Sequence, residues 1–158
     1  MGKVNFSGDF LTPGPLMAQG RPRRFPNLAS AAAQMPFLDY VTREALATLI
    51  LTPTGLMAYV PEAGRFLIHK LAVAAERPQS WATKQRKDVH QVLTLYTILH
   101  ATDPWSIDHA ASATREGREA KAFLARIRRG LEIARRQSGA NLTDLKDRIE
   151  RAAQSESL

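Results

Sequence analysis

The sequence predicts an α+β fold in which helices predominate, and three observations support this class. Two apolar runs, Leu46–Leu51 and Leu56–Val60, flank the turn-forming residues Thr52–Gly55, as in a β-hairpin. After Pro61, apolar residues recur at helical spacing for most of the remaining chain. Before the hairpin, the sequence is rich in proline, which interrupts regular structure. We therefore expect a small β part and a hairpin, followed by a bundle of four or five helices.

The composition limits the classes of protein to which the chain can belong. With 158 residues, of which 44% are hydrophobic and 23% charged, the chain has the size and balance of one globular domain. Its most apolar run, Ala45–Val60, is interrupted by Thr, Pro and Gly, so no membrane span is expected. The lack of cysteine excludes disulfides and thiolate metal sites, and with no signal-peptide pattern visible we expect a cytoplasmic protein. A net charge of +7 favours polyanionic partners such as nucleic acid, nucleotide phosphates or an acidic protein.

The sequence pattern changes near residue 61. We interpret residues 1–61 as a partial β-containing segment and residues 62–158 as a helical region. In the first segment, Val4–Leu11 has the apolar content of a strand. Residues 12–36 contain five prolines and predict an irregular connection with one helical turn at Leu28–Gln34. Helices are expected over residues 37–45, 61–76, 80–101, 105–113, 114–137 and 141–151.

Two charged residues fall among apolar positions of the predicted helices. Lys70 lies one turn after Phe66 on an apolar row, and Asp88 lies one turn before Val92. Because an unpaired buried charge is costly, each side chain needs a partner or a function. The structural explanations are a Lys70 that reaches the rim of the core and an ion pair between Lys84 and Asp88, one turn apart. The functional alternative is an ammonium group held toward a phosphate.

Other polar residues also allow two interpretations. His69 and His90 are lone histidines near apolar positions, where packing is a commoner role than metal binding. The helix expected at 114–137 has a basic outer face, which is either a solvated surface or a track for the phosphate backbone of nucleic acid. The basic residues of this face are Arg115, Arg118, Lys121, Arg128, Arg129, Arg135 and Arg136.

Four segments occur in an order that carries a family resemblance. They are Asp9–Pro13 (Asp-Phe-Leu-Thr-Pro), Phe37–Tyr40 (Phe-Leu-Asp-Tyr), Val60–Leu71, which contains Pro-Glu-Ala-Gly-Arg, and Lys84–Gln91, which contains Lys-Asp-Val-His. Together with the hairpin, they resemble a bacterial family of nucleotidyltransferase-fold proteins. The Lys followed by a later Lys-Asp is also distantly similar to minimal nucleotidyltransferases of the AbiEii toxin type. The resemblance covers residues 4–100 and implies the second half of that fold.

The resemblance also implies a function and residues that carry it. Such enzymes transfer a nucleoside monophosphate from an NTP to a hydroxyl group, with Mg²⁺ ions held by carboxylates, and a nucleic acid is one candidate acceptor. Asp9 matches the position of a metal ligand. Lys70 and Asp88 match catalytic positions, where Lys70 faces the nucleotide phosphates and Asp88 orients the site. Lys84 and Lys87 would add phosphate contacts.

The chain departs from the family pattern at its beginning. The family signature is a Gly-Ser pair followed by two acidic residues one position apart, and no such segment precedes Ser7-Gly8-Asp9. Because one carboxylate cannot hold two metal ions, we expect a truncated, carboxy-terminal portion that is inactive without a missing amino-terminal half or partner protein. The alternatives are a noncatalytic basic helical module that binds nucleic acid or a protein, and a remnant that self-associates. The candidate nucleic-acid-binding residues are Arg118, Lys121, Arg128 and Arg129.

Overall fold

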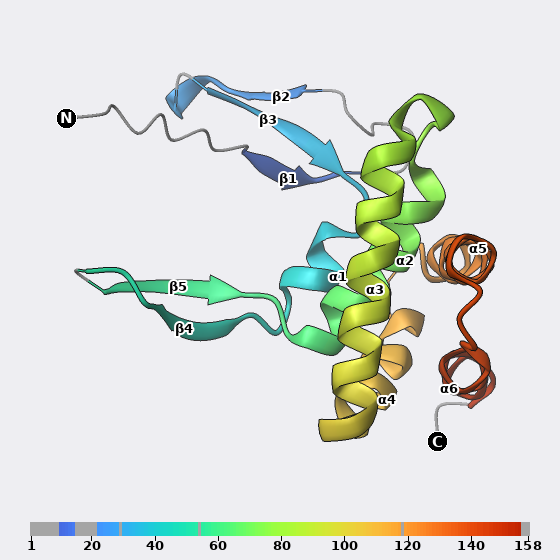
Figure 1. Cartoon of the computed structure of the whole chain (residues 1–158). Coiled ribbons are helices and arrows are strands. Elements are labelled where there is room, and N and C mark those ends of the chain that lie inside the picture. Colours follow the sequence, from blue (N-terminus) through green and yellow to red (C-terminus); the bar gives the residue numbers. More distant parts are fainter. Residues whose placement is uncertain (1–9, 15–21, 29, 54, 118, 156–158) are drawn as a thin grey trace. The chain divides into compact units, whose positions relative to one another are not determined.

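The computed structural model of the chain confirms the helix-dominated α+β class (Figure 1). The structure describes residues 10–14, 22–28, 30–53, 55–117 and 119–155. The chain divides into two compact units, Met1–Asp39 and Tyr40–Leu158. In the described parts of the chain, no helix has the length and apolar character needed to cross a membrane.

The first unit contains a three-stranded sheet. Its strands are β1 (Leu11–Pro13), β2 (Pro22–Phe25) and β3 (Ser30–Met35). The central strand, β3, pairs in parallel with β1 and antiparallel with β2. The prediction of an irregular connection with a helical turn at 28–34 is therefore wrong, because pairing on both sides of β3 outweighs the helix propensity of its three alanines. Of the strand predicted over 4–11, only the last two residues lie within the described part of the chain.

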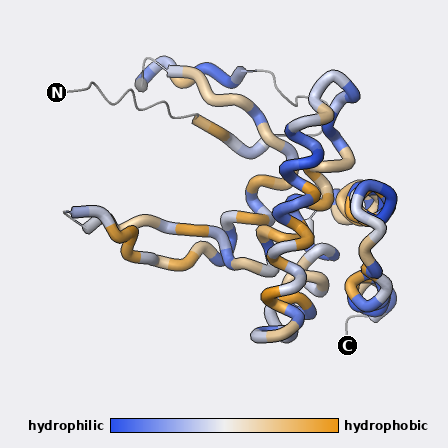
Figure 2. The backbone as a smooth tube through the Cα atoms, in the orientation of Figure 1, coloured by the Kyte–Doolittle hydropathy of each residue, from blue (hydrophilic) through white to orange (hydrophobic). Residues whose placement is uncertain are grey.

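The predicted hairpin is present in the second unit. It consists of β4 (Leu46–Ile50) and β5 (Leu56–Val60), which pair antiparallel along their full length. Gly55 adopts a φ of 65°, a conformation that glycine accepts without strain, and its amide donates to the carbonyl of Thr52. Most large apolar side chains of both strands are exposed, and Figure 2 shows the hairpin as hydrophobic along much of its length. No residue from 45 to 61 is charged.

Six helices account for most of the described second unit, although α1 begins at the end of the first. They are α1 (Leu38–Thr42), α2 (Ala63–Glu76), α3 (Ala82–Thr102), α4 (Pro104–Ser112), α5 (Ala120–Ser138) and α6 (Thr143–Gln154). The central helix is α2, which packs against α3, α4 and most extensively α5. Its core residues Leu67 and Leu71 are fully buried. At Gly130 of α5, an added Cβ would lie 2.0 Å from the Leu71 carbonyl oxygen, so only glycine allows this approach of the two backbones.

The ends of two helices follow from their sequences. The Glu62 carboxylate caps α2 by accepting hydrogen bonds from the amides of Gly64 and Arg65, at 2.8 and 2.7 Å. At its other end, α2 stops at Glu76 because Arg77 precedes a proline and adopts an extended conformation. The helix predicted to begin at residue 114 begins instead at Ala120, since Gly117, with a φ of 93°, interrupts the helical path.

Candidate functional site

The Asp88 carboxylate is buried between two helices and binds two cations. Asp88 projects from α3, and only 4% of its side chain is exposed. Its Oδ1 accepts a hydrogen bond from Lys70 Nζ of α2, and its Oδ2 accepts one from Arg77 Nε, both at 2.8 Å. The Lys84–Asp88 ion pair considered from the sequence is not formed, because Lys84 Nζ lies over the ring of Trp81 at 4.3 Å from its centre.

The two cations lie at the rim of the core. The side chains of Lys70 and Arg77 are 17% and 23% exposed, so both reach solvent while Asp88 does not. Lys70 Nζ also lies 5.1 Å from the centre of the Phe66 ring, which supports the expectation of a lysine at the edge of an apolar row. Two cations on one carboxylate leave this cluster with a net positive charge, which favours an anionic ligand.

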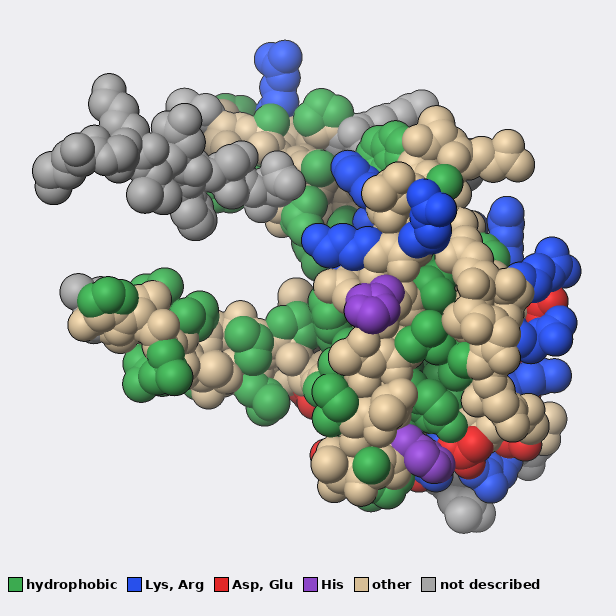
Figure 3. Space-filling model, viewed as in Figure 1, with side chains coloured by type: hydrophobic (Ala, Val, Ile, Leu, Met, Phe, Trp, Pro, Cys, Tyr) green, Lys and Arg blue, Asp and Glu red, His purple; other side chains and the backbone are tan. Residues whose placement is uncertain are grey.

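More positive charge surrounds this cluster at the beginning of α3. Lys84 and Lys87 are exposed, as is Arg86 between them. Figure 3 shows Lys and Arg side chains gathered over this end of α3. Two of the site residues predicted from the sequence, Lys70 and Asp88, are in direct contact. Two others, Lys84 and Lys87, lie on the exposed side of α3, the helix that carries Asp88. Asp9, the predicted metal ligand, lies outside the described residues.

The described residues do not fit a two-metal centre. Among them, no group of three or more His, Asp or Glu side chains is placed to hold a metal ion. Both oxygens of Asp88 already accept hydrogen bonds from cations, whose positive charge disfavours a metal ion at the same carboxylate. Of the two lone histidines, His69 is buried in α2, as a packing residue would be, whereas His90 is exposed on α3.

Arg65 of α2 is a second buried charge, for which the sequence analysis predicts no role. Its side chain is 1% exposed. The guanidinium donates to both carboxylate oxygens of Glu44, at 3.2 and 2.7 Å, and to the carbonyl oxygen of Tyr40, at 3.1 Å. The hydrogen bonds from Arg65 to Glu44, and to a smaller extent one with His109, lower the pKa of Glu44. Arg65 uses its donors in hydrogen bonds to Glu44 and Tyr40 and therefore offers no free charge to a ligand.

The sequence holds signals for both missed arginines. Arg65 shares a helical row with Ile68 and Ala72, so an apolar row continued through an arginine indicates a buried ion pair. Arg77 directly precedes Pro78, which ends α2 and turns the chain toward α3. A cation at this turn is well placed to reach the following helix.

A nucleotidyltransferase family model matches residues 2–115. The chain belongs to this family. The match covers most of the chain and includes both units, the hairpin and the helices that carry Lys70, Arg77 and Asp88. No curated protein and no solved structure matches the chain.

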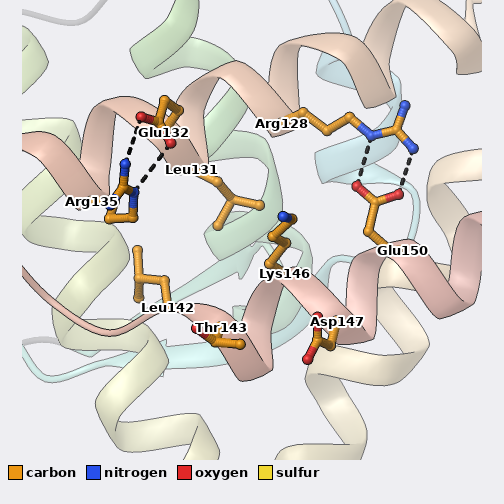
Figure 4. Close-up of a pocket in the computed structure, with 9 residues that line it drawn as sticks. All are labelled: Arg128, Leu131, Glu132, Arg135, Leu142, Thr143, Lys146, Asp147 and Glu150. Carbon is orange, nitrogen blue, oxygen red and sulfur yellow. Dashed lines mark hydrogen bonds and ion pairs between the residues drawn. The ribbon is translucent and has the colours of Figure 1, made fainter.

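In this nucleotidyltransferase family member, α5 and α6 lie beyond the matched residues. A groove of about 380 Å³ lies between them (Figure 4). It is lined by Arg128, Leu131, Glu132, Arg135, Leu142, Thr143, Lys146, Asp147 and Glu150. Arg128 donates to both carboxylate oxygens of Glu150, and Arg135 donates to both of Glu132.

These pairs change the interpretation of the basic face. Hydrogen bonds from Arg135, and to a smaller extent from Arg136, lower the pKa of Glu132 to about 2. This exposed carboxylate therefore remains ionised and offsets part of the charge of the two arginines. Of the four residues proposed for nucleic-acid binding, Arg128 is paired with Glu150, Arg118 lies outside the described residues, and Lys121 and Arg129 are exposed. The face is consequently less positive than its sequence indicates.

Proposed function

We propose that this chain supplies the phosphate-binding and orienting part of a nucleotidyltransferase active site. The observation that carries the proposal is the buried Asp88 carboxylate, which holds Lys70 and Arg77 at the rim of the core. The family match supports the class of reaction. In that reaction, a hydroxyl oxygen of the acceptor forms a bond to the α-phosphorus of an NTP, the bond to pyrophosphate breaks, and the hydroxyl loses its proton.

The donors of Lys70 and Arg77 suit this role. An ammonium group carries three N–H donors and a guanidinium five, and Asp88 takes one from each side chain. The donors that remain would bind phosphate oxygens of the NTP and neutralise charge that develops on the leaving pyrophosphate. Asp88 acts as a positioning residue, because its carboxylate is buried and fixes both cations. Lys84 and Lys87 are further candidates for phosphate contacts.

The metal remains a prediction. Family resemblance implies Mg²⁺, but among the described residues the carboxylates do not form a metal site, and Asp9 stays the predicted ligand. The dependence on a missing amino-terminal half or partner protein is likewise a prediction. It can be tested by incubating labelled NTPs with the chain alone and with a separately expressed upstream segment. Activity of the chain alone would contradict this predicted dependence.

Nucleotide binding provides the direct test of the proposed site. We expect Lys70→Met and Arg77→Met each to raise the dissociation constant for an NTP by about 10-fold or more, since a hydrogen bond to a charged group contributes about 1.5–3 kcal/mol. Lys146→Met, which removes an exposed lysine from α6, is the matched control and should leave binding unchanged. Isothermal titration calorimetry measures all three. Unchanged affinity in both site variants would contradict the proposal.

A second candidate function is a noncatalytic module that binds nucleic acid or a protein through α5. Exposed Lys121 and Arg129, which lie beyond the family match, favour it. It predicts salt-sensitive binding that charge reversal of these two residues weakens and that Lys70→Met does not change. Binding that depends on Lys70 instead would exclude this α5 surface as the main site.

A further inference from the structure

An exposed tryptophan lies between cations where α2 connects to α3. Trp81 ends the short 3-10 turn Gln79–Trp81 and is 47% exposed. Lys84 Nζ lies 4.3 Å and Arg77 Cζ 5.6 Å from the centre of a Trp81 ring. The exposed indole offers a face on which a planar group can stack, and the cations beside it favour a ligand that also carries negative charge.

The segment that carries Trp81 is rich in positive charge. Residues 77–88 contain four Lys or Arg and one acidic residue, Asp88. That carboxylate is buried and bound by Lys70 and Arg77, so it does not neutralise the exposed cations. Within the described residues, Lys84, Arg86 and Lys87 form no salt bridge. The first turn of α3 contains no acidic residue, so the positive end of the helix dipole adds to the field.

We propose that Trp81, Lys84, Arg86 and Lys87 bind single-stranded nucleic acid. One base stacks on the indole, and neighbouring backbone phosphates contact the three cations. The Lys84 ammonium covers the indole in the free protein, and its flexible side chain moves to a phosphate while the base takes its place. A duplex hides its base faces, and the Asp and Glu side chains of an acidic peptide carry charge without an aromatic face that stacks on an indole, so neither ligand uses both features of this surface.

Arg77 connects this surface to the phosphate site. Its Nε donates to Asp88, while its guanidinium carbon lies near the Trp81 ring. A strand stacked on Trp81 would therefore lie next to Lys70 and Arg77 and could present its hydroxyl to a bound NTP. The role of this strand as the acceptor rests on the proposed function, whereas strand binding itself does not. Lys84 and Lys87 would then contact the strand rather than the NTP.

Strand binding is measured with a labelled single-stranded oligonucleotide and fluorescence anisotropy, using the full chain without metal or NTP. Because stacking contributes about 1–3 kcal/mol per base, we expect Trp81→Ala to raise the dissociation constant about 5- to 150-fold. Trp81→Tyr, which keeps an aromatic ring, should retain most of the affinity. Lys146→Met on α6 is the charge control, and circular dichroism verifies that each variant is folded.

Tryptophan fluorescence tests whether the base stacks on Trp81. The protein has two tryptophans, and Trp105→Phe leaves Trp81 as the only one. In this variant, the oligonucleotide should quench the tryptophan fluorescence, and the same sequence as a duplex should quench it much less. Equal affinity of Trp81→Ala, equal binding of the duplex, or full competition by polyglutamate would each overturn the proposal.

The two proposals fail separately. Strand binding that is lost in Trp81→Ala but kept in Lys70→Met supports the strand surface, whatever the outcome with NTP. If NTP binding depends on Lys70 and no strand binds, only the strand surface is wrong. If the strand quenches Trp81 and no NTP binds, the phosphate site and the acceptor role are wrong. Strand binding lost only on charge reversal of Lys121 and Arg129 would move the surface to α5.

Discussion

Two charge clusters are attached to α2, and they have opposite arrangements. Around Arg65 the cation is buried, while the side chain of its partner Glu44 is 43% exposed. Around Asp88 the carboxylate is buried, and its partners Lys70 and Arg77 reach the surface. Both clusters join α2 to another segment of the second unit.

The two clusters differ in whether their cations have donors left to bind a ligand. The donors of Arg65 are directed to Glu44 and the Tyr40 carbonyl, and the net charge of the pair is zero. The Asp88 cluster exposes cations whose donors exceed the acceptors that Asp88 offers. A buried carboxylate can therefore hold cations ready for an anionic ligand, whereas a buried cation mainly stabilises the fold.

The largest effect on stability should follow from Glu44→Ala. This change leaves the buried Arg65 guanidinium without its carboxylate, with the carbonyl and the ring of Tyr40 as its remaining contacts among the described residues. Breaking a buried pair costs about 3–5 kcal/mol. Because Glu44 is partly exposed, we expect the lower end of this range, measured by urea unfolding. Glu116→Ala removes the partner of the exposed Arg43 and should cost less than about 1 kcal/mol. Equal losses in the two variants would contradict the structural role of Arg65.

A smaller loss of stability should follow from Asp88→Ala. Lys70 and Arg77 lose their shared acceptor, but both reach water, so we expect about 1–3 kcal/mol. Adding Lys70→Met should recover part of this loss, because it removes one of the two unpaired cations. A double-mutant cycle in urea unfolding measures the recovery. Additive losses would show that Lys70 and Asp88 are not energetically coupled.

Ligand binding should distinguish the clusters from each other. We expect Lys70→Met to weaken NTP binding, whereas Arg65→Met should leave it within about twofold, because Arg65 offers no free charge. Calorimetry below the melting temperature of each variant makes the comparison valid. A loss of NTP affinity in Arg65→Met alone would reverse the assignment of the two clusters.

The smallest effect concerns pH. Hydrogen bonds from Arg65 hold the pKa of Glu44 below its usual value of 4.5 in the folded protein. The stabilisation is therefore complete above the unfolded pKa and is lost as the pH falls through the lower folded pKa. In unfolding experiments from about pH 6 to about pH 3, Glu44→Gln should show a shallower loss of stability than the unaltered protein. Identical slopes would indicate that Glu44 titrates normally.

The sequence predicted local features better than pairings between segments. The hairpin and most helices were expected correctly, because strand alternation, turns and helical periodicity are local properties. Lys70 and Asp88 can be identified from the sequence, because a charged residue among apolar positions indicates that it has a partner or a function. Their mutual contact and the role of Arg77 depend on how α2 packs against α3, which no local pattern specifies. The strand Ser30–Met35 was missed for the same reason, since its partners lie on other segments.

The close approach at Gly130 has a consequence for shortening this protein. The family match ends at residue 115, but α2, inside the match, is covered by α5, outside it. A chain cut at that boundary would leave the α2 surface around Leu71 in water and should not fold stably. The region that matches the family is therefore shorter than the unit that we expect to fold.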